Sequence, residues 1–76
     1  MNDKQKTKVK AIREKIDTLR EELEEIKDAE QETWDNHSES WQDSDKGDEA
    51  QEAISSLENA VNDLQSAVDQ MDEVWQ

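Results

Sequence analysis

The sequence has 76 residues and a formal net charge of −13, with 41 % charged residues, 30 % hydrophobic residues, and no Cys or Pro. A chain of this length forms at most one small domain, and the lack of Cys excludes disulfides and thiolate metal sites. No apolar run exceeds two residues, so neither a membrane-spanning helix nor a signal peptide is predicted. We therefore expect a soluble protein located in the cytoplasm.

The charge is unevenly distributed along the chain. Residues 1–20 carry seven Lys or Arg against three acidic residues, whereas residues 21–76 carry two against nineteen. An acidic surface of this size repels nucleic acids and membranes and attracts basic proteins, with an effect that weakens as salt rises. We expect no direct contact with nucleic acid and none with a membrane.

A first helix is predicted at about residues 8–35. Its apolar residues recur at steps of three and four, which is the pattern of a heptad seam: Val9, Ile12, Ile16, Leu19, Leu23 and Ile26. The preceding residues are polar and Lys-rich with no apolar face, so we expect them to fray and helical order to begin near Thr7 or Lys8.

A corner is predicted at about residues 36–44. Trp34, His37 and Trp41 are spaced three and four residues apart, which places them on one face of the corner. Ser44 or Asp43 is expected to cap the next helix, because Ser and Asp accept hydrogen bonds from the free N–H groups of a first helical turn.

The second helix is predicted at about residues 45–75 and contains an internal repeat. The segments AISSLEN, AVNDLQS and AVDQMDE follow one another at seven residues, and each places an Ala beside the seam. Three apolar positions in seven is wider than a two-stranded coiled coil needs, and the small Ala residues allow another helix to approach closely.

These elements predict an all-α protein in which residues 1–76 form one antiparallel, coiled-coil-like helical hairpin. The hairpin brings the basic start of the first helix beside Asp69, Asp72 and Glu73. Because a lone hairpin leaves each seam half exposed, we expect two copies to pair as a homodimeric four-helix bundle; the rival hypothesis is a monomer that folds on its partner. The predicted oligomer interface follows the second seam: Ala53, Ile54, Leu57, Ala60, Val61, Leu64, Ala67, Val68 and Met71.

No motif in the sequence indicates catalysis, a metal or a cofactor. Acid–base catalysis needs a pocket that separates the pKa values of two groups, and a solvated helix surface provides none. The many carboxylates do not follow the spacing of a calcium-binding loop. We therefore expect a protein that is not an enzyme and that uses no metal or cofactor.

Two features are candidates for binding a partner. The indoles and imidazole of the corner could form a hot spot for a protein or stack on a base, or they could simply close the end of the bundle. The acidic run from Glu21 to Glu52, with fourteen acidic and two basic residues, could imitate DNA phosphates and attract a basic nucleic-acid-binding host protein. The candidate partner-binding residues are Glu21, Glu24, Glu25, Asp28, Glu32, Trp34, Asp35, His37 and Trp41.

The corner carries a specific set of residues: Glu30, Gln31, Glu32, Trp34, Asp35, Asn36, Glu39, Ser40, Gln42, Ser44 and Gly47. This set resembles the corner of small acidic helical hairpin proteins encoded by bacteriophages and prophages, and the resemblance extends over nearly the whole chain. It implies a phage setting, in the host bacterial cytosol, rather than a mechanism. Small cytosolic phage proteins without enzyme chemistry often bind a host protein or defence system, which favours an inhibitor or decoy.

Three functions are compatible with these observations. The first is an acidic binding protein, an anti-defence inhibitor or DNA-mimic decoy of a basic host protein. The second is a structural or assembly module whose role is helix association. The third is a small nucleotide-binding sponge that stacks a base on a Trp and contacts phosphate with the Lys-rich first helix.

Overall fold

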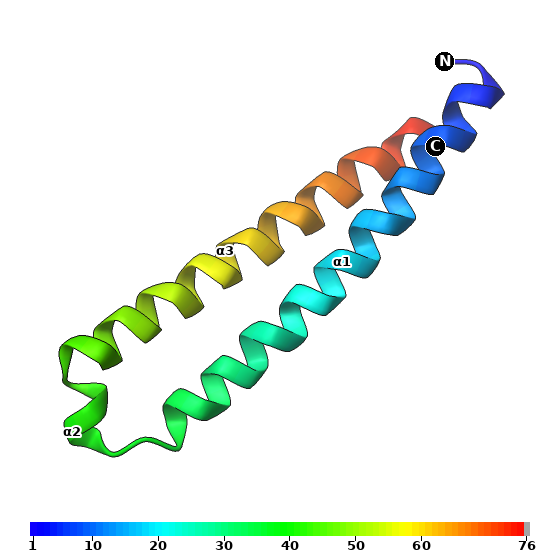
Figure 1. Ribbon diagram of the computed structural model, residues 1–76. Helices are drawn as coiled ribbons and strands as arrows, with labels where there is room; N and C mark the ends of the chain where they lie inside the picture. Colours follow the sequence, from blue (N-terminus) through cyan, green and yellow to red (C-terminus); the bar gives the residue numbers. More distant parts are fainter. Residues whose placement is uncertain (76) are drawn as a thin grey trace.

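The computed structural model describes residues 1–75 and is a narrow rod of helices measuring 58 × 15 × 14 Å. Its elements are α1 (Asp3–Asp35), α2 (Glu39–Gln42), α3 (Asp45–Asp72) and the short 3-10 helix η1 (Glu73–Trp75). Within the described residues every element is helical, so the predicted all-α class is confirmed. Figure 1 shows α1 and α3 side by side and running in opposite directions, with α2 at the turn and both termini at the other end.

Helix α1 begins five residues earlier than the sequence pattern predicts. Asn2 caps it, because the Asn2 side-chain oxygen accepts a hydrogen bond from the backbone N–H of Gln5 at 2.8 Å. The hydroxyl of Thr7 also donates to the carbonyl of Asp3 at 2.9 Å. Residues 3–7 lack an apolar face, but Lys and Gln are good helix formers, and a capped first turn extends the helix without burial.

Helix α3 begins where capping chemistry predicts. The hydroxyl of Ser44 accepts a hydrogen bond from the backbone N–H of Gly47 at 3.3 Å, which confirms Ser44 as the cap of the second helix. Helix α1 ends at Asp35, as predicted, and the backbone N–H groups of Asn36 and His37 donate to the carbonyls of Glu32 at 3.1 Å and Trp34 at 3.2 Å.

The core lies between α1 and α3 and is centred on one row of α3. Ile54, Val61 and Val68 are spaced by seven residues and are 4 %, 8 % and 0 % exposed. Helix α1 faces them with half-buried Val9, Ile16 and Leu23, also at intervals of seven. At about 25 cal/mol per Å² of apolar surface removed from water, this burial is the main force that holds the two helices together.

Candidate protein-binding surfaces

The corner is built around a hydrogen bond between the ends of α1 and α3. The indole N–H of Trp34, in the last turn of α1, donates to the carbonyl oxygen of Gly47 at 3.2 Å. The side-chain amide of Gln42 donates to the carbonyls of Trp34 at 2.9 Å and His37 at 3.2 Å. These bonds join α1, the turn and α2 to the start of α3, so the corner has a fixed geometry.

Gly47 is needed in the corner for close packing. It is the one buried Gly of the chain, and a Cβ atom at this position would clash with the backbone carbonyl oxygens of Trp41 and Gln42. Its backbone φ is not positive, so the requirement is space and not a left-handed conformation. Sequence reasoning did not assign this role to Gly47, nor the bridging role to Gln42; the signal available was a lone Gly three residues after a capping Ser.

His37 and Trp41 stack face to face. Their ring centroids are 3.6 Å apart and their planes differ by 13°. Ser38 caps the N-terminus of α2, because its hydroxyl accepts a hydrogen bond from the backbone N–H of Trp41 at 3.3 Å. His37 is exposed and Trp41 is half-buried, so the imidazole covers one face of the indole on the protein surface.

The three ring residues of the corner therefore have different environments. The structure brings His37 and Trp41 together, whereas the Trp34 indole N–H is directed toward the start of α3. Trp34 belongs to α1, His37 to the turn and Trp41 to α2. Trp34 is therefore part of the hydrogen-bonded framework of the corner, whereas His37 covers one face of the Trp41 indole.

The predicted acidic residues of α1 form a stripe along the helix. Glu21, Glu25, Asp28, Glu32 and Asp35 follow one another at steps of four and three residues, so they share one face, with successive carboxylates about 5 Å apart along the axis. All five are exposed. We call these five residues the acidic stripe.

Basic side chains partly neutralise this region. Arg20 contacts Glu24 at 2.9 Å and Glu21 at 3.7 Å, and Lys27 contacts Asp28 at 3.0 Å. The hydrogen bond to Asp28 is the main cause that raises the pKa of Lys27 above its ordinary value. Glu24 therefore belongs to the neighbourhood of Arg20, and the freest members of the acidic stripe are Glu25 and Glu32.

One long edge of the rod is closed by charged groups. Arg13 donates two hydrogen bonds to Asp72 across the helix pair, at 2.9 and 3.3 Å, and this contact between the basic start of α1 and the acidic end of α3 was predicted. The bond to Asp72 is the main cause that raises the pKa of Arg13. Attraction to Glu58 of α3 is among the causes that raise the pKa of Lys27. We call Arg13, Lys27, Glu58 and Asp72 the ionic edge.

The opposite edge is apolar and uncovered. Ile12, Leu19 and Ile26, spaced by seven residues, are 52 %, 58 % and 53 % exposed. Their counterparts on α3 occupy the row next to the core and are half-buried: Leu57, Leu64 and Met71. On each helix, the outer row follows the inward-facing row by three residues. In an antiparallel pair, an equal offset on the two helices turns both rows toward the same side of the rod. We call these six residues the open edge.

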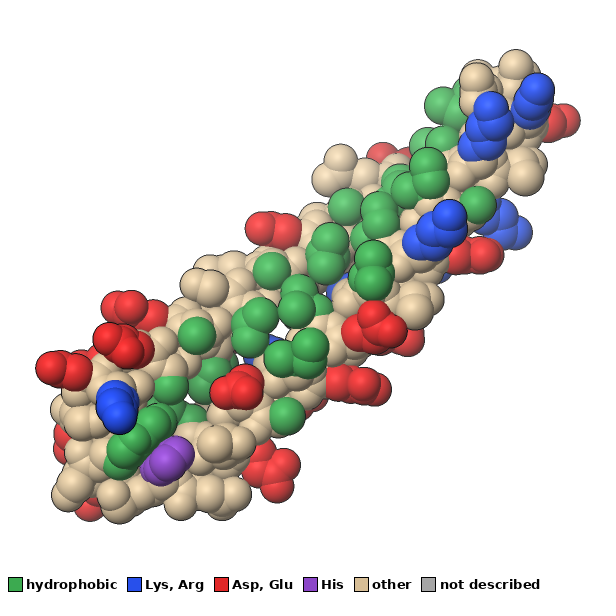
Figure 2. Space-filling model, viewed as in Figure 1, with side chains coloured by type: hydrophobic (Ala, Val, Ile, Leu, Met, Phe, Trp, Pro, Cys, Tyr) green, Lys and Arg blue, Asp and Glu red, His purple; other side chains and the backbone are tan. Residues whose placement is uncertain are grey.

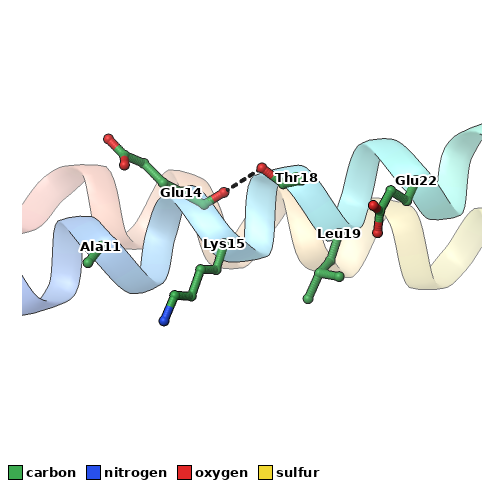
Figure 3. Close-up of a pocket in the computed structure, with 6 residues that line it drawn as sticks. All are labelled: Ala11, Glu14, Lys15, Thr18, Leu19 and Glu22. Atoms are coloured by element: carbon green, nitrogen blue, oxygen red, sulfur yellow. Dashed lines mark hydrogen bonds between the residues drawn. The ribbon is translucent and has the colours of Figure 1, made fainter.

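Figure 2 shows an apolar band running lengthwise along the rod between the two helices, with acidic side chains mostly at its margins. Beside the open edge, the surface of α1 forms a shallow groove of about 530 Å³ whose six lining residues all belong to α1: Ala11, Glu14, Lys15, Thr18, Leu19 and Glu22. In Figure 3, Ala11, Lys15, Leu19 and Glu22 point to the same side of the helix, while the hydroxyl of Thr18 donates to the carbonyl of Glu14 at 3.0 Å. A groove on a single helix has no opposite wall, which suits another helix better than a small ligand.

Packing of α1 against α3 buries some of the predicted interface residues, so fewer of them can contact a second copy. Ile54, Val61 and Val68 are covered by α1 of their own chain and leave almost no side-chain surface for an oligomer interface. The other predicted interface residues keep exposed surface: Ala53, Leu57, Ala60, Leu64, Ala67 and Met71. On α1, the exposed seam residues Ile12, Leu19 and Ile26 lie outside the predicted interface.

The separation of the corner from the N-terminal lysines bears on the nucleotide hypothesis. Lys10 and Trp34 are 24 residues apart on one helix, or roughly 36 Å at 1.5 Å per residue, so one nucleotide cannot contact both. Trp75 is the indole near the lysines, and with Lys6, Thr7 and Lys10 it lines a hollow of about 230 Å³. This hollow is smaller than the roughly 300 to 1,000 Å³ of typical ligand pockets.

Neither a cluster of metal ligands nor a membrane-spanning helix is present among the described residues. Among residues 1–75, no three His, Asp or Glu side chains are placed to hold a metal ion together. Over the same residues, none of the helices combines the length and apolar character required to cross a membrane. No protein-family model, curated protein or solved structure matches this chain.

Proposed function

We propose that this chain is a non-enzymatic helical hairpin that acts as an association module, with the open edge as its binding surface. The observation that carries the proposal is the row of Ile12, Leu19 and Ile26, each more than half exposed beside the half-buried row of α3. Large aliphatic side chains in a continuous exposed row are typical of a surface that another protein covers. The heptad spacing of both rows suits helices as the covering elements.

The contrast between the two edges supports this assignment. The ionic edge is closed within the chain by Arg13 and Asp72, which leaves few apolar groups to cover there. The open edge has no such contacts, and burial of its side chains is the largest favourable term that the rod has left to gain. Association through this edge would complete the core that one helix pair leaves half exposed.

Replacement of Leu19 by Glu tests the proposal. The expected result is loss of association in sedimentation velocity and in capture from a bacterial lysate, with the helical circular dichroism of the chain retained. The matched control is Lys10→Gln, which makes the same change in net charge on an exposed position of α1 outside both the open edge and the groove and should leave association nearly unchanged. Equal association of the Leu19→Glu variant and the unaltered protein would rule out the open edge as the binding surface.

A second candidate function rests on the acidic stripe. We infer that its regularly spaced carboxylates could recruit a basic nucleic-acid-binding host protein as a decoy for DNA, as expected of a phage inhibitor. Its support is the placement of five exposed carboxylates on one face of a rigid helix, away from α3. The field of such a row attracts Lys- and Arg-rich surfaces and is screened by salt.

The decoy function is tested with Glu21, Glu25 and Glu32 replaced together by Gln. Capture of a basic protein should fall and should lose its dependence on salt. The control replaces three exposed acids of α3, Glu52, Asp63 and Asp69, by their amides, which makes the same change in net charge on the other helix. If both triple variants capture the same proteins with the same salt dependence, the acidic stripe is not the recognition surface.

A further inference from the structure

We propose that the occupant of the open edge is a second copy of this chain, running antiparallel to the first so that α1 packs against α1 and α3 against α3. This inference rests on the proposed association through the open edge and adds the partner and its direction. The two-fold axis passes near Leu19 and Leu64, the central members of the two open-edge rows.

The distribution of charge along the rod selects the antiparallel arrangement. The half with the start of α1 and the end of α3, residues 1–18 and 66–75, carries six Lys or Arg against six Asp or Glu. The half with the corner, residues 19–65, carries three Lys or Arg against sixteen acids. Parallel copies would place two strongly acidic halves side by side, whereas antiparallel copies place each acidic half against a neutral one that is rich in lysine.

The groove on α1 gives the register of this contact. In an antiparallel α1 pair centred on Leu19, position 15 lies next to position 22 or 23 of the other copy. Lys15 and Glu22 both line the groove beside Leu19, and Figure 3 shows them on the same side of α1. Lys15 of each copy therefore meets Glu22 of the other, and two-fold symmetry makes this ion pair twice.

The α3 helices fit the same axis. Arg13 of α1 lies level with Asp72 of α3, so an axis at Leu19 meets α3 near residues 65 and 66. This axis places Ala67 of one copy opposite Leu64 of the other, and both are half-buried with surface left to cover. Two-fold symmetry thus matches a small residue to a large one on α3 and opposite charges on α1.

The outline of one long face of the rod is similar in size to a standard protein interface. A long face of the rod measures 58 by 15 Å, and the product of these lengths is about 870 Å². A standard protein interface buries about 800 Å² on each partner. Full overlap of the two rods is therefore needed, which the antiparallel arrangement about a central axis provides.

Charge reversal at the reciprocal pair tests the arrangement. Lys15→Glu and Glu22→Lys should each raise the dimer Kd about tenfold, because each turns two attractive pairs into repulsive ones. An equimolar mixture of the two variants should dimerise as tightly as the unaltered protein, and so should the double variant. Lys10→Glu and Glu21→Lys make the same changes in net charge on an exposed face of α1 outside the groove and should show no such rescue on mixing.

Spectroscopic distances provide a second, independent test. The chain has no Cys, so a spin label on Lys10→Cys or Asp28→Cys is the only label present. These sites lie nine residues on either side of Leu19. In the antiparallel dimer, same-site labels are separated by roughly 27 Å along the axis, whereas a mixture of the two labelled chains brings unlike sites level with each other. Parallel copies give the opposite result.

The outcomes separate this inference from the proposed function. A protein that remains monomeric up to millimolar concentration overturns the second copy as the occupant, while capture of another protein that depends on Leu19 would still support the open edge. A dimer that survives Leu19→Glu overturns both. Two other outcomes would keep the open edge as the binding surface and overturn the antiparallel arrangement. In the first, the dimer depends on Leu19 but mixing the two charge variants restores no affinity. In the second, same-site labels lie at the same height along the rod.

Discussion

The indole N–H of Trp34 donates a hydrogen bond to the carbonyl oxygen of Gly47, 3.2 Å away, and so joins the last turn of α1 to the first turn of α3. The same first turn of α3 is capped by Ser44, whose hydroxyl also donates to the carbonyl of Trp41. The direction in which α3 leaves the corner is thus fixed by side chains of α1 and of the turn.

Replacement of Trp34 by Phe tests the contribution of this bond. The variant keeps an aromatic ring but removes the indole N–H, and we expect a loss of about 0.5 to 1.5 kcal/mol in the free energy of unfolding. Trp41→Phe is the control, since it keeps a ring for His37 to stack on and no indole bond is lost there. Urea unfolding followed by circular dichroism, at one fixed protein concentration, measures both. A larger loss for Trp41→Phe than for Trp34→Phe would contradict the assignment.

Replacement of Gly47 by Ala should destabilise the protein, even though Ala is the better helix former by about 1 kcal/mol. The added methyl group meets backbone carbonyls of residues 41 and 42, which cannot move aside as a side chain would. Overpacking of this kind typically costs about 1 to 3 kcal/mol. Ser56→Ala, on an exposed turn of the same helix, should instead raise the thermal midpoint slightly. If Gly47→Ala were as stable as Ser56→Ala, the close contact would not exist in solution.

The sequence was sufficient to predict the helices, because their periodicity and caps are local properties. The heptad rows, the end of α1 at Asp35 and the cap at Ser44 all follow from residues within a few positions of each other. The predicted start of α1, near residue 8, is too late. Hydrophobic periodicity gives no signal for a polar first turn such as the one that Asn2 caps. Propensity and capping alone decide such a turn.

The candidate surfaces depend on contacts that periodicity does not specify. Both rows of each seam look equally apolar in the sequence. On α3, however, Ile54 is 4 % exposed while Leu57 is half-buried, and on α1 Leu19 is 58 % exposed while Ile16 is half-buried. Which row faces inward is set by how the two helices rotate against each other, and the Arg13–Asp72 contact on one edge is part of that choice. Likewise, nothing local to Trp34 indicates that its N–H reaches a carbonyl 13 residues away.

The contact between Arg13 and Asp72 should contribute to the alignment of α1 on α3, with an effect that depends on salt. Arg13→Gln and Asp72→Asn should each lower the thermal midpoint slightly at low ionic strength, and the double variant should be little worse than either single one. Added salt should reduce all three effects, because both side chains are partly exposed. Lys10→Gln removes a positive charge from the same helix without breaking this contact and is the control. Strictly additive losses would show that the two groups do not interact.

The sharpest prediction separates the core from the open edge. Ile54→Ala removes atoms from a site that is 4 % exposed, and we expect a loss of about 2 to 5 kcal/mol in the free energy of unfolding. Leu19→Ala removes a similar volume from a side chain that is 58 % exposed. In dilute solution, where the chain is alone, Leu19→Ala should therefore cost much less than Ile54→Ala. As protein concentration rises, association should raise the thermal midpoint of the unaltered protein, and it should raise the midpoint of Leu19→Ala by less. Circular dichroism melts over a wide range of concentrations measure this difference. Parallel midpoints for the two chains at every concentration would mean that Leu19 takes no part in association.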